Sequence, residues 1–135
     1  MNINININTS ININIKIHII GISIRKGDFK TFFPETQIDD ELIMTFINKL
    51  IHTTKDINTK IFFCSDDKEY EYQMRLKIKN SIIPNYNNDN DFIDFLILSK
   101  CIKIYGTNKS SFSEEASYFG GCDYIPLTLD IINNP

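Results

Sequence analysis

"IGISIRKGDF" (residues 20–29) is the stretch that decides the fold, because it joins a buried strand to a polar loop within ten residues. Residues 20–24 are all apolar or small, which is typical of a strand covered on both faces. The strand then breaks into Arg25, Lys26, Gly27 and Asp28. Such a break at the end of a core strand is either a plain turn with a solvated ion pair or part of a binding site. In the turn interpretation, Gly27 supplies the backbone freedom.

The arginine in this stretch favours a binding site for an anion. The chain has 14 basic residues, and only Arg25 and Arg75 are arginines. A planar guanidinium grips phosphate or carboxylate with two hydrogen bonds, which a lysine cannot reproduce. Arg75 falls on a predicted helix, so we expect it to lie away from the end of the strand and to have no part in the site.

Short apolar strands and amphipathic helices alternate along the rest of the chain. Strands are predicted at 16–25, 59–67, 102–108 and 122–127, helices at 39–52, 67–80, 91–101 and 111–121, and a short strand or turn at 81–86. This order predicts an α/β fold, a Rossmann-like three-layer α/β/α domain with a mostly parallel sheet, over residues 16–135. The Asn/Ile-rich segment before it, residues 1–15, is either an edge strand or low-complexity sequence.

Length and composition exclude several classes of protein. A chain of 135 residues with a net charge of −3 and no basic run is one domain that does not bind nucleic acid. Its three cysteines form no CxxC pair, which favours free thiols in a reducing compartment. No apolar run is long enough to span a bilayer, and the N-terminus lacks the pattern of a secretory signal. The chain is therefore assigned by default to the cytoplasm.

Polar clusters follow three of the predicted strands. They are "SIRKGD" (23–28), "CSDD" (64–67) and "GTNKSSFS" (106–113). Because ligands of open parallel sheets bind outside the carboxyl ends of the strands, we expect the three clusters to share one edge.

Each cluster also has a structural interpretation. The Ser65–Asp67 segment opens a helix, where Ser or Asp is an ordinary N-cap, and its paired aspartates are also suggestive of Mg²⁺. Ser111 with Glu114 three residues later spells a capping box. The alternative there is a phosphate cradle of hydroxyls and backbone amides, with Glu114 and Glu115 pointing away. Asp89 and Asp91 spell the D-x-D of metal-dependent sugar transferases, but they follow no apolar strand, so no metal ligand is assigned.

Taken in order, these clusters resemble the three motifs of the GDP-fucose-dependent fucosyltransferases, nearest the α-1,2 branch. The matching stretches are "SIRKGDF" (23–29), "FFCSDDKEY" (62–70) and "DFLILSKCIKIYGTNKSSFSEEASYFGG" (94–121). The resemblance covers most of this chain but only the C-terminal, donor-binding half of a typical member. It implies one half of a two-domain GT-B-type glycosyltransferase.

The resemblance also implies a role for each matched residue. Arg25 would hold the pyrophosphate of GDP-fucose and stabilise GDP as it leaves, with Asp28 as its partner or near the acceptor. Asp94 would accept hydrogen bonds from the guanine edge. Ser23, Asp66, Asp67, Ser111, Phe112 and Ser113 would complete the nucleotide pocket.

The implied reaction moves fucose from GDP-fucose to a glycan or protein hydroxyl, with inversion and without a metal or other cofactor. The chain departs from the family at three points. Ser23 stands where histidine is usual, Glu114 and Glu115 stand where aromatic residues are common, and nothing corresponds to the N-terminal acceptor domain. The alternative function is a non-catalytic or degenerate GDP-sugar-binding domain.

Overall fold

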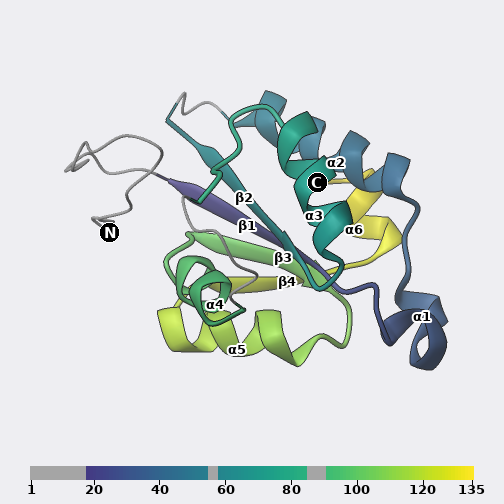
Figure 1. Ribbon diagram of the computed structural model, residues 1–135. Helices are drawn as coiled ribbons and strands as arrows, with labels where there is room; N and C mark the ends of the chain where they lie inside the picture. The colour runs from purple at the N-terminus through teal and green to yellow at the C-terminus, as the bar shows by residue number, and fades with distance from the viewer. Residues whose placement is uncertain (1–17, 55–57, 85–90) are drawn as a thin grey trace.

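The computed structural model describes residues 18–54, 58–84 and 91–135, within which four parallel strands form one sheet (Figure 1). The strands are β1 (Ile19–Ile24), β2 (Lys60–Ser65), β3 (Lys103–Thr107) and β4 (Asp123–Leu127). Their order across the sheet is β2-β1-β3-β4, and each neighbouring pair is parallel. The predicted α/β class with a mostly parallel sheet is confirmed.

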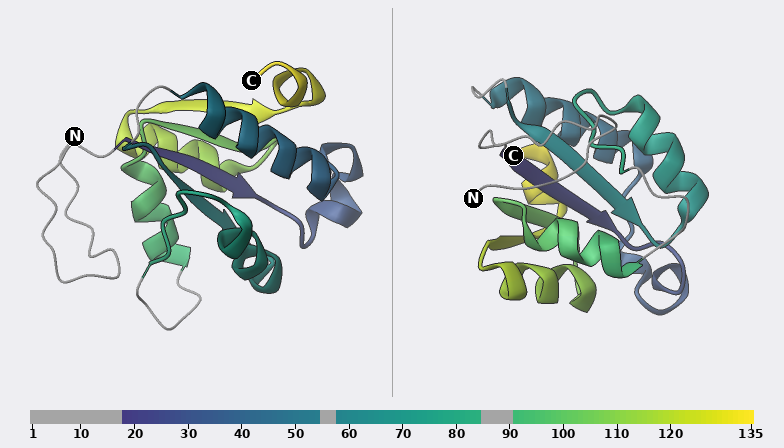
Figure 2. Two further views of the ribbon diagram at one scale, coloured as in Figure 1. Left: turned by 90° about the horizontal axis from the view of Figure 1, so that it is seen from above. Right: turned by 60° about the vertical axis from the view of Figure 1, so that its left-hand side comes forward.

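Helices cover both faces of this sheet. They are α1 (Phe29–Phe32), α2 (Asp40–Thr53), α3 (Lys68–Lys77), α4 (Asp91–Ser99), α5 (Ser111–Gly120) and α6 (Leu129–Asn133), with a 3-10 turn η1 (Pro34–Thr36) after α1. Figures 1 and 2 show α2, α3 and α6 on one face, and α4 and α5 on the other. The four predicted helices are present, whereas α1, η1 and α6 were not predicted.

The core has two layers because successive strand residues point to opposite faces. On β1, Ile20 and Ile22 pack with α2 and α3, whereas Ile19 packs with α4 and α5. On β2, Phe63 joins the first layer and Phe62 the second. Both faces are buried, which explains why these strands are continuous apolar runs rather than alternating ones.

The predicted fifth strand is not formed. In the described part of 81–86, Ser81 makes a single isolated bridge with Ile61, and residues 82–84 form neither a strand nor a turn. Pro84 has no amide hydrogen to continue a ladder. The Asn/Ile-rich segment 1–15 lies outside the described residues.

The strand order places a switch point between β1 and β3. From β1 the chain crosses to β2 on one side through α2, and from β3 it crosses to β4 on the other side through α5. The connections therefore diverge above the carboxyl ends of β1 and β3, where open parallel sheets bind their ligands. These two strands end at Ile24 and Thr107, within two of the polar clusters.

Candidate functional site

The three polar clusters meet at the carboxyl edge of the sheet, as predicted. The backbone amide of Arg25 donates to Thr107 Oγ1 at 2.8 Å, which joins the loops after β1 and β3. The next amide, of Lys26, donates to Asp66 Oδ1 at 2.8 Å and joins the loops after β1 and β2. Two consecutive amides thus connect the β1 loop to both neighbouring strands.

Arg25 is held at this edge with its hydrogen bonding incomplete. Its Nε lies 3.6 Å from Asp66 Oδ2, and its Nη2 lies 3.7 Å from Asp28 Oδ1. Both distances are longer than a hydrogen bond. Its Nε is buried and has no hydrogen-bond partner among the described residues, and its guanidinium carbon lies 5.5 Å from the centre of the Phe29 ring. Because an unpaired buried donor is costly, this group is suited to an incoming anion.

Gly27 is required here for close approach rather than for turn geometry. A Cβ at Gly27 would lie 2.5 Å from Asp66 Oδ2, the same carboxylate that holds the Lys26 amide. Its φ is not in the left-handed region, since in the described ranges only Gly121 is a glycine with a positive φ. The interpretation of Gly27 as a source of backbone freedom was therefore wrong.

Four of the predicted site residues line one small cleft of about 20 Å³ next to this loop. They are Ser23, Arg25, Asp66 and Phe112, and they share the cleft with Cys64, Ser65 and Asp91. Asp28 lies beside Arg25 but is well exposed. The structure therefore brings together residues from the ends of β1 and β2 and the start of α5.

Asp67 has a capping role instead. Its carboxylate accepts a hydrogen bond from the Tyr70 amide at 3.1 Å, which makes it the N-cap of α3. Of the three residues 65–67, this one bears out the capping interpretation, whereas Asp66 binds the neighbouring loop.

The predicted capping box at α5 is wrong. The N-cap is Ser110, and no side chain caps the helix there. Ser111 is already inside the helix and exposed, while Ser113 is buried, with its hydroxyl 3.3 Å from that of Ser110. Gly106 of β3 allows this approach, since a Cβ there would lie 2.6 Å from Ser113 Oγ. The first turn of α5 therefore lies tightly against the sheet.

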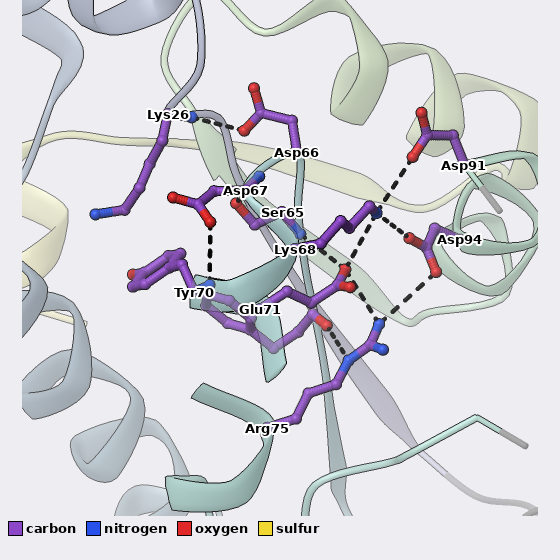
Figure 3. Close-up of polar contacts among 11 residues, drawn as sticks. Lys26, Ser65, Asp66, Asp67, Lys68, Tyr70, Glu71, Arg75, Asp91 and Asp94 are labelled. Carbon is purple, nitrogen blue, oxygen red and sulfur yellow. Dashed lines mark hydrogen bonds and ion pairs between the residues drawn. The ribbon is translucent and has the colours of Figure 1, made fainter. Parts of the chain in front are cut away.

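Asp94, the predicted guanine contact, lies in a buried network of charges between α3 and α4 (Figure 3). It is 2% exposed, with Oδ2 at 3.4 Å from Lys68 Nζ and Oδ1 at 3.7 Å from Arg75 Nη2. Glu71, 6% exposed, faces the same two cations at 3.6 and 3.3 Å. Lys68 also reaches Asp91 at the cleft, at 3.3 Å.

Arg75 is part of this network and not a bystander, contrary to the sequence prediction. Its Nε donates to the carbonyl oxygen of Phe63 in β2 at 2.8 Å, and its guanidinium carbon lies 5.2 Å from the centre of the Phe62 ring. Glu71 accepts from the Ser65 amide at 3.1 Å. The network therefore fixes α3 to the carboxyl end of β2.

Burial and charge act in opposite directions on the two network residues whose pKa values shift. Burial alone would lower the pKa of Lys68, but Glu71, Asp94 and Asp91 together raise it above its ordinary value. Burial raises the pKa of Glu71, and Arg75 opposes this only in part. Lys68 thus remains charged, while Glu71 carries an energetic cost for its charge.

Within the described residues, no cluster of three or more His, Cys, Asp or Glu side chains is arranged to hold a metal ion. Of the D-x-D pair, Asp89 lies outside those residues and Asp91 binds Lys68. No described helix is both long and apolar enough to cross a bilayer.

Several residues that build the site were missed from the sequence. Thr107 and Lys68 act through contacts between distant segments, which no local pattern reveals. Phe29 and Glu71 also contact residues four positions away in the sequence. One signal was present, because Glu71 and Arg75 are four residues apart on a predicted helix, the spacing of an ion pair.

Comparison with known proteins identifies a similar fold. No protein-family model and no curated protein sequence matches the chain. A solved structure described as NodZ alpha-1,6-fucosyltransferase soaked with GDP-fucose is similar, with a TM-score of 0.56 and 15% sequence identity. The similarity covers 84% of this chain but 39% of that one, so this chain spans well under half the length of its structural relative. The domain therefore has a fucosyltransferase-like α/β fold.

Proposed function

We propose that this domain binds a GDP-fucose-type nucleotide sugar across the carboxyl ends of its strands, with Arg25 on the pyrophosphate. The observation that carries the proposal is the Arg25 guanidinium, which is held at the switch point of the sheet with a buried Nε that makes no hydrogen bond within residues 18–54, 58–84 and 91–135. The motif order in the sequence and the GDP-fucose-soaked structural relative support the choice of donor.

The reaction we propose is fucosyl transfer to a glycan or protein hydroxyl. The bond between fucose C1 and the phosphate oxygen breaks, the acceptor oxygen bonds to C1 from the opposite face, and the hydroxyl proton is released. Negative charge grows on the departing GDP, and Arg25 can neutralise it without a metal ion. Asp28, 3.7 Å from Arg25 Nη2, either orients the guanidinium or lies near the acceptor.

The other proposed contacts differ in how accessible they are. Ser23, Asp66 and Phe112 already line the cleft beside Arg25, and the uncapped first turn of α5 offers backbone amides to a phosphate. The cleft is small, so the nucleotide would lie across the open edge rather than inside it. A guanine base would reach Asp94 only if Lys68 and Arg75 moved aside, since each now faces one of its oxygens.

A second candidate is donor binding without turnover. The likeness covers 39% of the structural relative, so it supports donor binding without carrying over that protein's whole reaction. The two functions separate in a transfer assay, which follows release of GDP from GDP-fucose with and without added acceptor glycans. Acceptor-dependent release supports the transferase, whereas tight GDP binding without release supports the binding domain.

Thermal unfolding with nucleotides tests the shared part of both candidates. GDP and GDP-fucose should raise the melting temperature, and UDP should not. A ligand at about 100 times its Kd adds roughly 2.7 kcal/mol to the free energy of unfolding. We expect EDTA to leave the shift unchanged. Equal shifts with GDP and UDP would remove the guanine assignment, and no shift with any nucleotide would contradict donor binding altogether.

A further inference from the structure

A second and larger cavity opens at the carboxyl ends of β3 and β4. It has a volume of about 340 Å³, within the range of small-molecule sites. It is lined by Glu35, Thr36, Gln37, Ile38, Asn108, Leu127, Thr128, Leu129 and Asp130. Of these residues, only Asn108 belongs to a motif that suggested the donor site, namely the third.

The chemistry of the wall favours an uncharged ligand over a phosphate-bearing one. Two carboxylates, Glu35 and Asp130, line the cavity, and none of its lining residues is a lysine or arginine. An anion would therefore face the Asp130 carboxylate, and Lys109, the cation beside the wall, is already paired with Glu35 at 2.7 Å. Ile38, Leu127 and Leu129 add an aliphatic patch beside the polar groups. Such a wall suits an uncharged ring whose C–H face packs on the aliphatic side chains and whose hydroxyl groups bond to the amide and carboxylate oxygens.

Some of the polar side chains are available to such a ligand. In the described parts of the chain, no hydrogen bond or ion pair engages the Asn108 amide group or the Asp130 carboxylate. Gln37 uses its Nε2 to donate to the carbonyl oxygen of Arg25 at 3.1 Å, which leaves its own carbonyl oxygen as an acceptor. The Glu35 carboxylate, in contrast, already forms an ion pair with Lys109 at 2.7 Å.

The cavity is adjacent to the candidate donor site. A narrow cleft of about 10 Å³ is lined by Arg25 and Thr107 and shares Thr36, Gln37, Ile38 and Leu127 with the cavity wall. Gln37 contacts both spaces, because it lines the cavity while its side chain holds the backbone of Arg25. A ligand in the cavity would thus lie next to the residue proposed to hold the pyrophosphate.

We propose that this cavity binds an uncharged sugar ring and holds the acceptor on this domain. The binding of an uncharged sugar follows from the wall alone, whereas its role as acceptor rests on the proposed function. The Asp130 carboxylate and the Gln37 carbonyl oxygen accept hydrogen bonds from its hydroxyl groups, and the Asn108 amide can accept or donate. Leu127 and Leu129 contact its C–H face.

Side-chain amide resonances of the isotope-labelled full chain test the proposal by NMR. We expect lactose, N-acetylglucosamine or methyl galactoside, each titrated to millimolar concentration, to shift the signals of Gln37 and Asn108. Inorganic pyrophosphate should leave both signals in place. Leu129, 58% exposed at the cavity, provides the blocking variant Leu129→Trp, which should raise the apparent Kd for the sugar at least tenfold. Leu76→Trp on α3 is the matched control, since Leu76 is 59% exposed and lies outside the cavity.

The outcomes separate this proposal from the function on which it builds. No shift with any of the three sugars, or the same sugar affinity in Leu129→Trp as in Leu76→Trp, would overturn the cavity assignment. GDP titrations of the same samples report on the donor site independently. Sugar binding without GDP binding would retain the cavity and reject the transferase, whereas GDP binding without sugar binding would do the reverse.

Discussion

The two arginines of this chain lie near the same end of the sheet but in different environments. Arg75 is 11% exposed, donates its Nε to a backbone carbonyl of β2, and faces two buried carboxylates. Arg25 is 30% exposed, and its buried Nε has no hydrogen-bond partner. Both residues lie near the carboxyl end of the sheet, so position alone does not separate them.

The difference shows what each guanidinium is for. A planar group with five donors is useful wherever two or more acceptors must be bound in fixed geometry. Around Arg75 the fold supplies a carbonyl acceptor for Nε and two carboxylates near Nη2, so the residue holds α3 against β2, although in the described residues Nη2 is buried without a hydrogen bond. Around Arg25 the fold supplies only distant carboxylates, so a ligand is needed to complete the geometry. We therefore expect changes at Arg75 to affect folding and changes at Arg25 to affect binding.

The largest effect, on the free energy of unfolding, is expected from Arg75→Met, which removes one of the two cations of the buried network. Asp94 and Glu71 would remain buried with Lys68 as their shared cation. Breaking a buried pair in this way costs about 3–5 kcal/mol. Urea denaturation should show this loss in the free energy of unfolding, and Arg75→Lys should fall between the variant and the parent. A loss below about 1 kcal/mol for Arg75→Met would contradict a structural role for this arginine.

A smaller effect is expected from Arg25→Lys, and on a different property. The change keeps the charge and removes the fork, so the fold should survive while GDP affinity falls about tenfold, or about 1.4 kcal/mol. Calorimetric titration measures the affinity, and the melting temperature without ligand measures the fold. Lys26→Arg should not restore binding, because the Lys26 ammonium group is directed to Asp40 at 2.6 Å. Unaltered GDP affinity would mean that the guanidinium geometry is irrelevant.

Gly27→Ala should have an effect of about 1 kcal/mol on stability. The added Cβ displaces the Asp66 carboxylate and weakens its bond to the Lys26 amide, and a bond of this kind is worth about 1 kcal/mol. The background variant Asp66→Ala is the control. In that background the alanine at position 27 should cost much less, because the clash has been removed. If Gly27→Ala lowers the free energy of unfolding equally in both backgrounds, contact with Asp66 is not the reason that position 27 is a glycine.

The smallest effect is a pH dependence from Glu71. Burial raises its pKa in the folded state above the ordinary value of 4.5. Between that value and the raised pKa, the folded state binds more protons than the unfolded state, so stability falls as the pH rises. Urea denaturation from pH 4 to pH 7 should therefore show the parent losing stability relative to Glu71→Gln. If the difference in free energy of unfolding between the parent and Glu71→Gln stays constant with pH, or changes in the opposite direction, the raised pKa is contradicted.

Much of the fold was predictable because it depends on local patterns. The apolar runs at Ile19–Ile24 and Lys60–Ser65 and the amphipathic helix at Asp40–Thr53 are encoded by period and burial alone. The short helices were missed because four or five residues carry too little periodicity, as in Phe29–Phe32. Their ends are set by tertiary contacts that the sequence pattern does not contain.

The candidate site was predictable in its location but not in its contacts. The polar ends of three parallel strands had to meet at one edge, and this placed Arg25 and Asp66 together. The sequence could not show that Asp94 is enclosed by Lys68 and Arg75, because these contacts join two helices across an intervening loop. The same limit led to the error about Arg75.

The central claim is that Arg25 is left incompletely bonded by the protein because it binds a phosphate group. The chain contains only two arginines, so an ¹H–¹⁵N spectrum of the arginine Nε–H region should contain only two such signals. Arg25→Lys identifies one of them by its loss. When the parent is titrated with GDP, the Arg25 signal should shift and saturate while the Arg75 signal stays in place. A titration that leaves the Arg25 signal unmoved would contradict the account.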